Sequence, residues 1–549
     1  MAFKDTVQRV IFALIKMRKL LQDSGTGERH RRAHQHWTVL FLIAVLCNLV
    51  RTSLNAAITD TLNTPLLIPK NATGEQIARQ ICVSCHLFPE PQVLDKKTWQ
   101  EQVLPRMETM LGVSPPDYSS SPEGELLRQL HIYPDNAAIG KVDWEKIVDY
   151  YMNAAPERPL PQEPHAEIKV GLPQFTASAA RFRYTPPATT LVAVSSRQHK
   201  IFLGDDLARS IVILDAEGRS LDSLRVGNSP VSLFETERGI YVTAIGSVQP
   251  SEMPRGELLF FARNGDKFGP RKVLLKDLPR PVQAEFGDFN RDGEMDVAIC
   301  LFGNHRGRFS WFENLGKDVY TEHALVELPG AVHCLSHDFN GDGVPDLGLL
   351  MAQRTESFHI FTNDGKGNFG SEIVFQKQPA FGHNYFELAD FNGDGRRDLL
   401  VVNGDNGEYE SALKNYHGIR IYLNRGGARF EEAFFFPLNG ATKAIARDFD
   451  GDGDLDVTAI SFYPDYVKTP RESFVYLENQ GGLKFSPSTF PQCISGRWIV
   501  MDAGDVDGDG DLDIILGSYI RGPTVVPDFL SKTWEKQGPS LMILKNNRR

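Results

Sequence analysis

Two hydrophobic patterns divide the chain. Between residues 68 and 155, apolar side chains recur at helical spacing, as in "ATGEQIARQICVSCH", "DKKTWQEQV", "EGELLRQL" and "VDWEKIVDYYMN". From residue 173 onward, short apolar runs such as "DLLVVNG" and "DIILGSY" alternate with Gly- and Asp-rich turns, which indicates β-strands. The intervening segment, 156–172, is rich in proline and cannot form a helix or a central strand. The pattern therefore predicts a small all-α domain at 68–155, a Pro-rich linker at 156–172 and an all-β domain at 173–549.

An apolar run at 37–50 follows a basic stretch near the N-terminus. The run is shorter than the roughly 20 residues of a relaxed transmembrane helix. Its length and basic flank fit the core of a signal peptide. The alternative is an uncleaved membrane anchor formed by residues 37–57. We interpret 1–60 as a cytoplasmic basic stretch plus a signal peptide or membrane anchor. Either way the rest of the chain is expected in the periplasm or on the outer face of the inner membrane.

Charge and cysteine content narrow the function classes. The formal net charge is −11, which argues against nucleic-acid binding through a basic surface. Six cysteines in 549 residues are too few for a disulfide scaffold. Cys300, Cys334 and Cys493 lie in strand-like stretches and are expected to be buried thiols. Cys82 and Cys85 instead belong to a motif.

That motif is C-x-x-C-H, formed by Cys82, Cys85 and His86. In such a motif two thiols attach haem covalently, and the histidine supplies one axial nitrogen to the iron. A redox C-x-x-C pair would instead require a preceding strand and a βαβ unit, whereas the surrounding pattern is helical. A small helical domain that begins with this motif resembles a c-type cytochrome. The resemblance implies covalently bound haem c.

The sixth ligand of the haem iron is less constrained by the sequence. Met107 is our choice, because Pro105 is expected to break the preceding helix and leave Met107 on a turn facing the haem. Met110, Met152 and His131 are the alternatives. A thioether ligand would favour an electron carrier, whereas an open sixth position would favour ligand binding or catalysis.

An acidic nine-residue pattern repeats five times in the second half of the chain. Its copies are "DFNRDGEMD", "DFNGDGVPD", "DFNGDGRRD", "DFDGDGDLD" and "DVDGDGDLD", which begin at residues 288, 338, 390, 448 and 505. Side-chain oxygens at positions 1, 3, 5 and 9 suit Ca²⁺, and glycine at position 6 permits a sharp turn. An EF-hand is excluded, because position 12 is never glutamate and the flanks are β-like.

The pattern resembles the FG-GAP or VCBS repeats of integrin-α-like β-propellers. The resemblance covers 281–549 and includes closing strands such as "IYLNRGGARF" and "VYLENQGGLKF". It implies calcium loops between the first and second strands of five blades, and thus up to five Ca²⁺ ions. Carried over by position, the ligands are Asp288, Asn290, Asp292, Asp296, Asp338, Asn340, Asp342, Asp346, Asp390, Asn392, Asp394, Asp398, Asp448, Asp450, Asp452, Asp456, Asp505, Asp507, Asp509 and Asp513.

Residues 188–280 lack these loops but keep the strand pattern, and they are expected to form two further blades. The whole is then a seven-bladed β-propeller. Its last blade lacks a fourth strand at the C-terminus, so we expect 173–184 to close the ring by pairing there.

The loop face opposite the calcium loops is a candidate ligand face. His333, His383, Lys443 and Arg497 stand at blade entries and are expected on this face. Such residues would suit an anionic or sugar-like ligand or a protein partner.

Two functions from different classes remain. The first is an extracytoplasmic c-type cytochrome for electron transfer, whose propeller binds a redox partner or a glycan or protein ligand. The alternative is a haem-coupled enzyme, a dehydrogenase or a polysaccharide-active protein, with its site on the candidate ligand face. Quinoprotein dehydrogenase propellers carry Trp-centred repeats, and this chain has six Trp and no such repeat, which disfavours that version of the enzyme.

Overall fold

The computed structural model describes residues 68–406, 412–522 and 526–548. Residues Lys70–Arg549 form one compact unit. The expected signal peptide or membrane anchor at 37–57 lies outside the described residues. Within the part that is described, no helix has both the length and the apolar character needed to cross a membrane.

The region 74–154 is helical, as its hydrophobic spacing predicts. The helices are α3 (Gly74–Ile81), α4 (Lys96–Thr98), α5 (Leu104–Met110), α6 (Gly124–Gln129) and α7 (Lys141–Ala154). Single helical turns η1 (Cys82–Ser84), η2 (Pro91–Val93), η3 (Trp99–Val103) and η4 (Tyr118–Ser120) connect them. Thr73 and Gln76 form a capping box that fixes the start of α3. Ile77 and Ile81 of α3 are buried, as are Trp144 and Ile147 of α7, and the two helices contact each other.

Pro105 does not break its helix, contrary to the expectation from the sequence. The chain runs from α4 through the π-helical turn η3 directly into α5, and Leu104 N–H donates to the carbonyl of Trp99. A π turn shifts the hydrogen-bond ladder by one residue, which accommodates the missing N–H of proline. Met107 therefore lies within α5 and not on a turn, and it is half-buried.

The rest of the chain forms a seven-bladed β-propeller. Each blade is an antiparallel sheet of four strands, and blade 6 carries one extra short strand, β1 (Lys169–Val170). Blades 1 and 2 contain β3 (Thr189–Ser195), β4 (Lys200–Asp205), β5 (Ser210–Leu214), β6 (Ser220–Arg225), β7 (Pro230–Glu235), β8 (Gly239–Ala244), β9 (Gly256–Asn264) and β10 (Lys267–Leu278). Blades 3 and 4 contain β11 (Pro281–Gly287), β12 (Asp296–Leu301), β13 (Arg308–Asn314), β14 (Tyr320–Val326), β15 (Ala331–His337), β16 (Asp346–Met351), β17 (Ser357–Asn363) and β18 (Phe369–Gln376).

The last three blades complete the ring. They contain β19 (His383–Ala389), β20 (Asp398–Asn403), β21 (Gly418–Asn424), β22 (Phe430–Pro437), β23 (Ala441–Arg447), β24 (Asp456–Ser461), β25 (Phe474–Asn479), β26 (Phe485–Thr489), β27 (Trp498–Gly504), β28 (Asp513–Ser518), β29 (Leu541–Asn546) and β2 (Phe175–Ala179). Turns η5 (Pro470–Ser473) and η6 (Cys493–Ser495) and helix α8 (Asp528–Gln537) lie in their connections.

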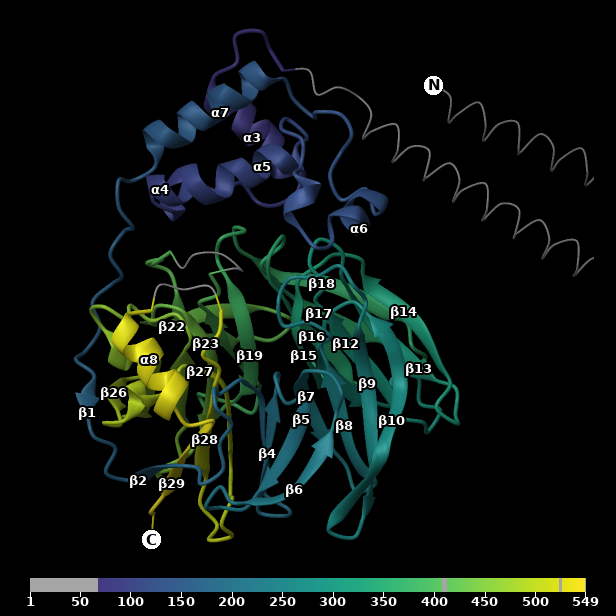
Figure 1. Ribbon diagram of the computed structural model, residues 1–549, viewed down its shortest axis with the longest axis vertical. Coiled ribbons are helices and arrows are strands. Elements are labelled where there is room, and N and C mark those ends of the chain that lie inside the picture. The colour runs from purple at the N-terminus through teal and green to yellow at the C-terminus, as the bar shows by residue number, and fades with distance from the viewer. Residues whose placement is uncertain (1–67, 407–411, 523–525, 549) are drawn as a thin grey trace, which may run out of the picture. The chain divides into compact units, whose positions relative to one another are not determined.

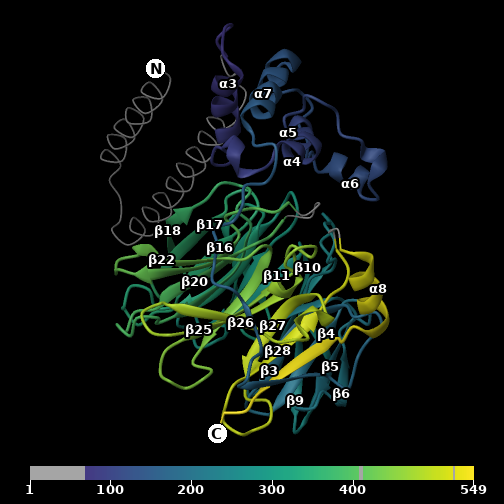
Figure 2. The same cartoon turned by 90° about the vertical axis from the view of Figure 1, so that its left-hand side faces the viewer.

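The ring closes through the early strand β2. It pairs antiparallel with β29, from Phe175 opposite Asn546 to Ala179 opposite Met542. Figure 1 shows the C-terminus beside these two strands, and Figure 2 shows the same ring after a quarter turn. The first strands of successive blades contact one another all the way round, from β3 to β27 and back to β3. Unexpectedly, β1 adds a parallel strand to β26, within the segment interpreted as linker.

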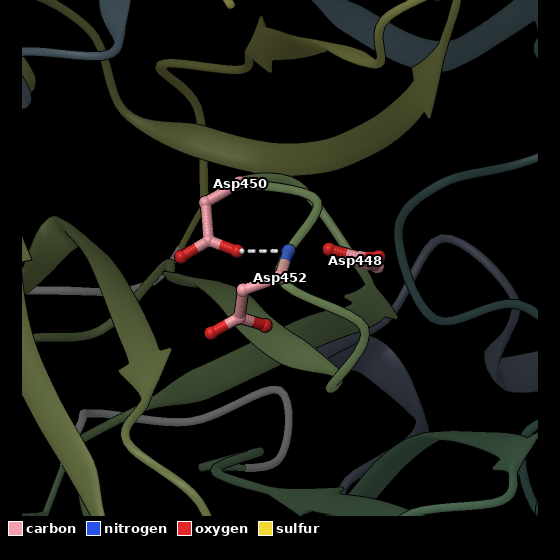
Figure 3. Close-up of side chains that lie close together, drawn as sticks. All are labelled: Asp448, Asp450 and Asp452. Atoms are coloured by element: carbon pink, nitrogen blue, oxygen red, sulfur yellow. Dashed lines mark hydrogen bonds between the residues drawn. The ribbon is translucent and has the colours of Figure 1, made fainter.

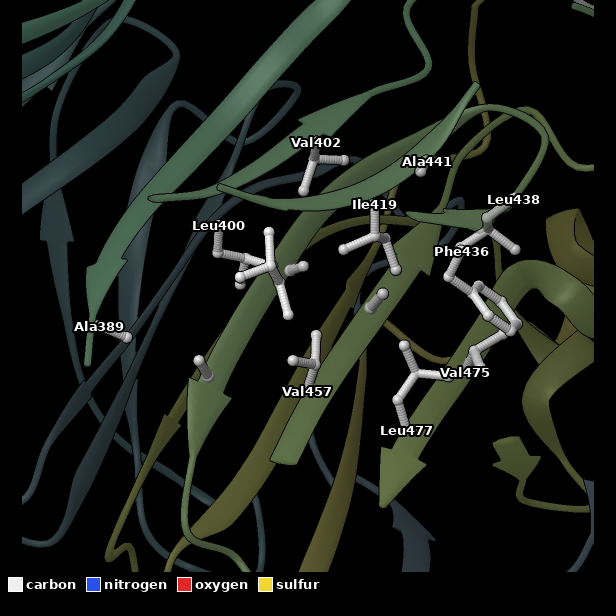
Figure 4. Close-up of a cluster of buried hydrophobic side chains, with 14 of the residues drawn as sticks. Ala389, Leu400, Val402, Ile419, Phe436, Leu438, Ala441, Val457, Val475 and Leu477 are labelled. Carbon is white, nitrogen blue, oxygen red and sulfur yellow. The ribbon is translucent and has the colours of Figure 1, made fainter. Parts of the chain in front are cut away.

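Buried side chains fill the spaces between neighbouring blades. One cluster joins blades 5 and 6 through Leu400, Ile419, Val457 and Val475, all fully buried (Figure 4). All six residues of each second strand in blades 3 to 7 are buried, whereas the fourth strands of blades 3 to 5 are mostly half-buried or exposed. The second strands therefore form the rigid frame from which the preceding acidic loops project.

Candidate calcium loops and haem-attachment motif

The aspartate at position 9 of each acidic loop ties that loop to its blade. In blade 3, Asp296 is fully buried, and its carboxylate accepts the backbone N–H groups of Phe289 at 3.0 Å and Asn314 at 2.7 Å. Asp346, Asp398, Asp456 and Asp513 bind the equivalent amides in their blades. Burial raises the pKa of Asp296 to about 6. A carboxylate oxygen has two acceptor sites, so these bonds leave room for a cation.

The aspartate at position 1 accepts hydrogen bonds from backbone N–H groups of its own loop and so stabilises the turn. In blade 4, Asp338 accepts the backbone N–H of Gly341 at 2.7 Å and that of Gly343 at 2.8 Å. Gly343, at position 6, has a φ of +78°, a left-handed conformation that favours glycine. Slight burial raises the pKa of Asp338, but the amides of Gly343, Gly341 and Asp342 outweigh it and hold the pKa below its usual range.

The loops of blades 3, 4 and 5 carry asparagine at position 3. Its amide nitrogen donates to the aspartate at position 5: Asn290 to Asp292 at 3.0 Å, Asn340 to Asp342 at 2.9 Å and Asn392 to Asp394 at 3.1 Å. Its amide oxygen accepts the backbone N–H of the same aspartate. These three loops thus satisfy many of their own acceptors, and we name them the Asn loops.

The loops of blades 6 and 7 carry aspartate at position 3, and we name them the Asp loops. In blade 6, carboxylate oxygens of Asp448, Asp450 and Asp452 all lie within 4.8 Å of one another (Figure 3). In blade 7 the same holds for Asp505, Asp507 and Asp513. Asp450 accepts the backbone N–H of Asp452 at 3.1 Å but has no amide nitrogen to offer in return.

Acceptors in the Asp loops remain unsatisfied among the described residues. Oδ1 of Asp448 is buried there without a hydrogen-bond partner. So are Oδ1 of Asp454 and both carboxylate oxygens of Asp511, which stand at position 7. Burial, followed by the neighbouring Asp509, raises the pKa of Asp511 to about 6. Unpaired buried carboxylate oxygens at such close range fit a hard cation that takes oxygen ligands, which is the chemistry of Ca²⁺.

Asp454 and Asp511 are candidate cation ligands that were not predicted from the sequence. Position 7 varies among the five loops, so a side-chain role was not expected there. The available signal was composition: only these two loops have aspartate at every odd position.

The C-x-x-C-H motif follows directly on α3. Cys82 opens the turn η1 and is half-buried, whereas Cys85 is exposed, and both thiols are free. Burial raises the pKa of Cys82 to about 11. Two free thiols, three residues apart in the sequence, thus follow the end of the helix and precede the histidine.

His86 has one ring nitrogen engaged. Its Nδ1 lies 2.8 Å from the carbonyl oxygen of Leu87, and because a carbonyl only accepts, Nδ1 donates and carries the proton. This tautomer leaves the lone pair on Nε2, as an axial metal ligand requires. Val83 and Leu87 beside the motif are 52% and 42% exposed, so two apolar side chains next to the thiols are open to contact with a bound group. The donor set fits haem c, while Met107 as sixth ligand stays a prediction.

The four residues of the candidate ligand face do not share one exposed surface. His383 is 1% exposed, and its Nδ1 lies 3.1 Å from the buried carboxylate of Glu356. Arg497 is also 1% exposed; it donates to the carbonyl of Phe462 at 3.3 Å and stacks on that ring. The expectation that these two residues face a ligand is wrong, because both are buried in contacts within the propeller.

His333 and Lys443 lie on first strands at half-buried positions. Tyr385, on the intervening first strand β19, contacts both side chains: its ring centroid is 4.5 Å from the ring centroid of His333 and 4.9 Å from Nζ of Lys443. Burial lowers the pKa of His333 to about 3, so its imidazole is neutral at physiological pH.

Comparison with known proteins bears on the propeller. The profile of the FG-GAP-like repeat matches residues 288–349, 338–401, 390–459 and 448–516. A T-cell immunomodulatory protein homolog from Plasmodium yoelii yoelii is 24% identical over 254 residues, covering 34% of this chain and 34% of the relative. The chain thus spans about a third of the length of the curated relative it matches.

Two solved structures are also similar. A luciferin-regenerating enzyme is 10% identical, with a TM-score of 0.34, over 52% of this chain and 88% of that chain. BBS1N in complex with ARL6DN is 8% identical, with a TM-score of 0.39, over 68% of this chain and 97% of that chain. At these scores neither likeness supports an argument about this protein. The described chain thus contains a seven-bladed β-propeller with FG-GAP-like repeats, and a propeller of this kind fits a binding role.

Proposed function

We propose that this protein is an extracytoplasmic c-type cytochrome for electron transfer, joined to a calcium-binding propeller that binds a partner. One observation carries the electron-transfer part. The free thiols of Cys82 and Cys85 stand beside His86, whose tautomer leaves Nε2 as a ligand nitrogen. Haem bound there would supply reversible one-electron exchange.

The chain's own residues would hold and shield this group. Cys82 and Cys85 would attach it covalently, and Nε2 of His86 would bind the iron. The carbonyl of Leu87 would orient the imidazole through Nδ1. Fully buried Trp99 and Tyr151, with ring centroids 4.3 Å apart, would keep the supporting helices rigid.

The acidic loops support the calcium part of the proposal. Each loop would supply only oxygen ligands to one Ca²⁺, so up to five ions would stiffen the propeller. The convergent carboxylates and unpaired oxygens of the Asp loops are the specific support. The repeats themselves fit a binding role, and part of the chain matches part of a T-cell immunomodulatory protein homolog. A protein or glycan partner in the extracytoplasmic space is the binding function that we propose for the propeller.

The electron-transfer proposal is tested by expressing the full chain with a haem-attachment system. We expect the purified protein to carry one covalent haem, seen as a mass increase and as the visible bands of reduced haem c. Cys82→Ala and Cys85→Ala should lose most of the covalent haem. Ser84→Ala, between the two cysteines, is the matched control and should keep it. A colourless wild-type protein after such maturation contradicts the proposal.

A further inference from the structure

The loop between β16 and β17 is strained. Gln353 has a φ of +60° and Glu356 a φ of +35°, and neither residue is glycine. Left-handed backbone at non-glycine residues costs free energy and persists only where the surroundings enforce it. Two such residues within four positions indicate a loop that is held in shape from outside.

Glu356 and His383 hold the loop. Glu356 is 2% exposed, and its carboxylate accepts the backbone N–H of His383 at 2.8 Å. The His383 ring packs between Phe375 and Phe381, with centroid distances of 5.8 Å and 5.0 Å. The carbonyl of Glu356 also accepts the N–H of Lys377 at 2.8 Å. Blade 5 thereby fixes the conformation of a blade 4 loop.

The loop presents Arg354 to the C-x-x-C-H motif. Arg354 is exposed, and its Nε donates to the carbonyl oxygen of Cys85 at 2.9 Å. Among the described residues it has no ion-pair partner within 4.0 Å, so its charge is not neutralised by a nearby carboxylate. The propeller makes a second contact with the helical region, after the motif: Tyr416 Oη donates to the carbonyl oxygen of Val93 at 3.2 Å. The ring of Tyr416 stacks on Phe381, next to His383.

We propose that Arg354 is a positioning residue for the haem-attachment motif, supplied by the propeller and locked in place by Glu356 and His383. It fixes the peptide group between Cys85 and His86 and holds a positive charge beside the imidazole. This inference rests on the proposed haem function for its redox consequence: a fixed positive charge near the iron favours the reduced state and raises the midpoint potential.

The test uses the full chain and the substitution Arg354→Gln. The matched control is Arg306→Gln, because Arg306 is an exposed arginine in the equivalent β12–β13 loop of the preceding blade. The first readout, amide hydrogen exchange in a peptide covering 82–88, does not depend on haem. We expect exchange there to rise roughly tenfold in Arg354→Gln, as loss of a charge-assisted hydrogen bond implies. Exchange should not change in Arg306→Gln.

The second readout is the midpoint potential of the haem-loaded protein, which should fall in Arg354→Gln alone. Unchanged exchange at 82–88 overturns the inference, whether or not haem is bound. A colourless protein with faster exchange in Arg354→Gln supports the positioning role while refuting the haem function. A coloured protein whose potential and exchange match wild type in both variants overturns the inference and leaves the haem function standing.

Discussion

The Asn loops and the Asp loops follow the same nine-residue pattern and differ in few side chains. In the blade 4 loop, Asn340 donates to Asp342, and Asp338 is surrounded by backbone donors. In the blade 6 loop, Asp450 occupies the place of Asn340 and can only accept. The amide at position 3 is thus one difference between a loop that satisfies many of its own acceptors and a loop that holds three carboxylates within 4.8 Å. The other charged difference is at position 7, where Val344 is replaced by Asp454.

The difference shows which loops depend on a cation. The blade 6 loop packs five aspartates into nine residues, and its Asp448 has a buried oxygen without a partner among the described residues. The blade 7 loop is similar. Each Asp loop also has a basic side chain near it: Nζ of Lys545 lies 3.1 Å from Asp507 in blade 7, and Nη2 of Arg548 donates to the carbonyl of Gly451 in blade 6 at 3.0 Å. Like charges as close as those of the aspartates destabilise the folded state unless a cation lies between them. The two Asp loops are therefore the loops expected to depend most on a cation.

Calcium removal should have the largest effect. A ligand that binds only the folded state at a hundred times its Kd stabilises it by roughly 3 kcal/mol. We expect a chelator to lower the melting temperature of the full chain. Hydrogen exchange should rise first at 448–456 and 505–513. Magnesium should restore little, because it demands a tighter octahedral site. Equal exchange at 338–346 and 448–456 after chelation would remove the distinction between the two kinds of loop.

Swapping the distinguishing residue should convert one kind of loop into the other. Asp450→Asn replaces a charged ligand by a neutral one, which should weaken calcium binding in that loop about tenfold. In chelator the same variant should be more stable than wild type by about 1 kcal/mol, because repulsion falls and a hydrogen bond forms. Calcium titration by calorimetry and denaturant melts with and without chelator measure both effects.

Asn340→Asp is the matched reverse exchange. It removes the donor to Asp342 and adds a charge, so stability in chelator should fall while dependence on calcium should rise. If both substitutions shift stability in the same direction in chelator, position 3 does not decide the behaviour of the loop.

The repeating loops made the propeller predictable from the sequence. Their spacing marks where each second strand begins, since Asp296 and its equivalents both end a loop and open a buried six-residue strand. The need to cover an exposed edge pointed to the pairing of β2 with β29. These features follow from local chemistry repeated five times.

Side-chain directions were not predictable in the same way. His383 is the first residue of β19, and Lys443 is the third residue of β23. In a regular strand these two positions would lie on the same face, but both strands have a bulge between their first and third residues, which shifts the register. The bulge places His383 inside the blade and Lys443 beside Tyr385. Pro105 was misjudged for a related reason: the rule that proline ends a helix is local, whereas η3 allows the helix to continue between buried Trp99 and Leu104.

The last prediction is a pH dependence outside the acidic loops, which separates the ordinary pH dependence of stability from loss of calcium. Glu285 on β11 accepts the backbone N–H of Ser336 at 3.2 Å, and burial raises the pKa of its carboxyl from 4.5 to about 7. Between these values the folded state binds more protons than the unfolded state, so stability should fall as pH rises from about 4.5 to about 7. Glu285→Gln should flatten this slope in urea melts performed in chelator, while Glu257→Gln, at a surface ion pair with Arg271, should keep it. A slope that Glu285→Gln leaves unchanged would assign the pH dependence to other groups.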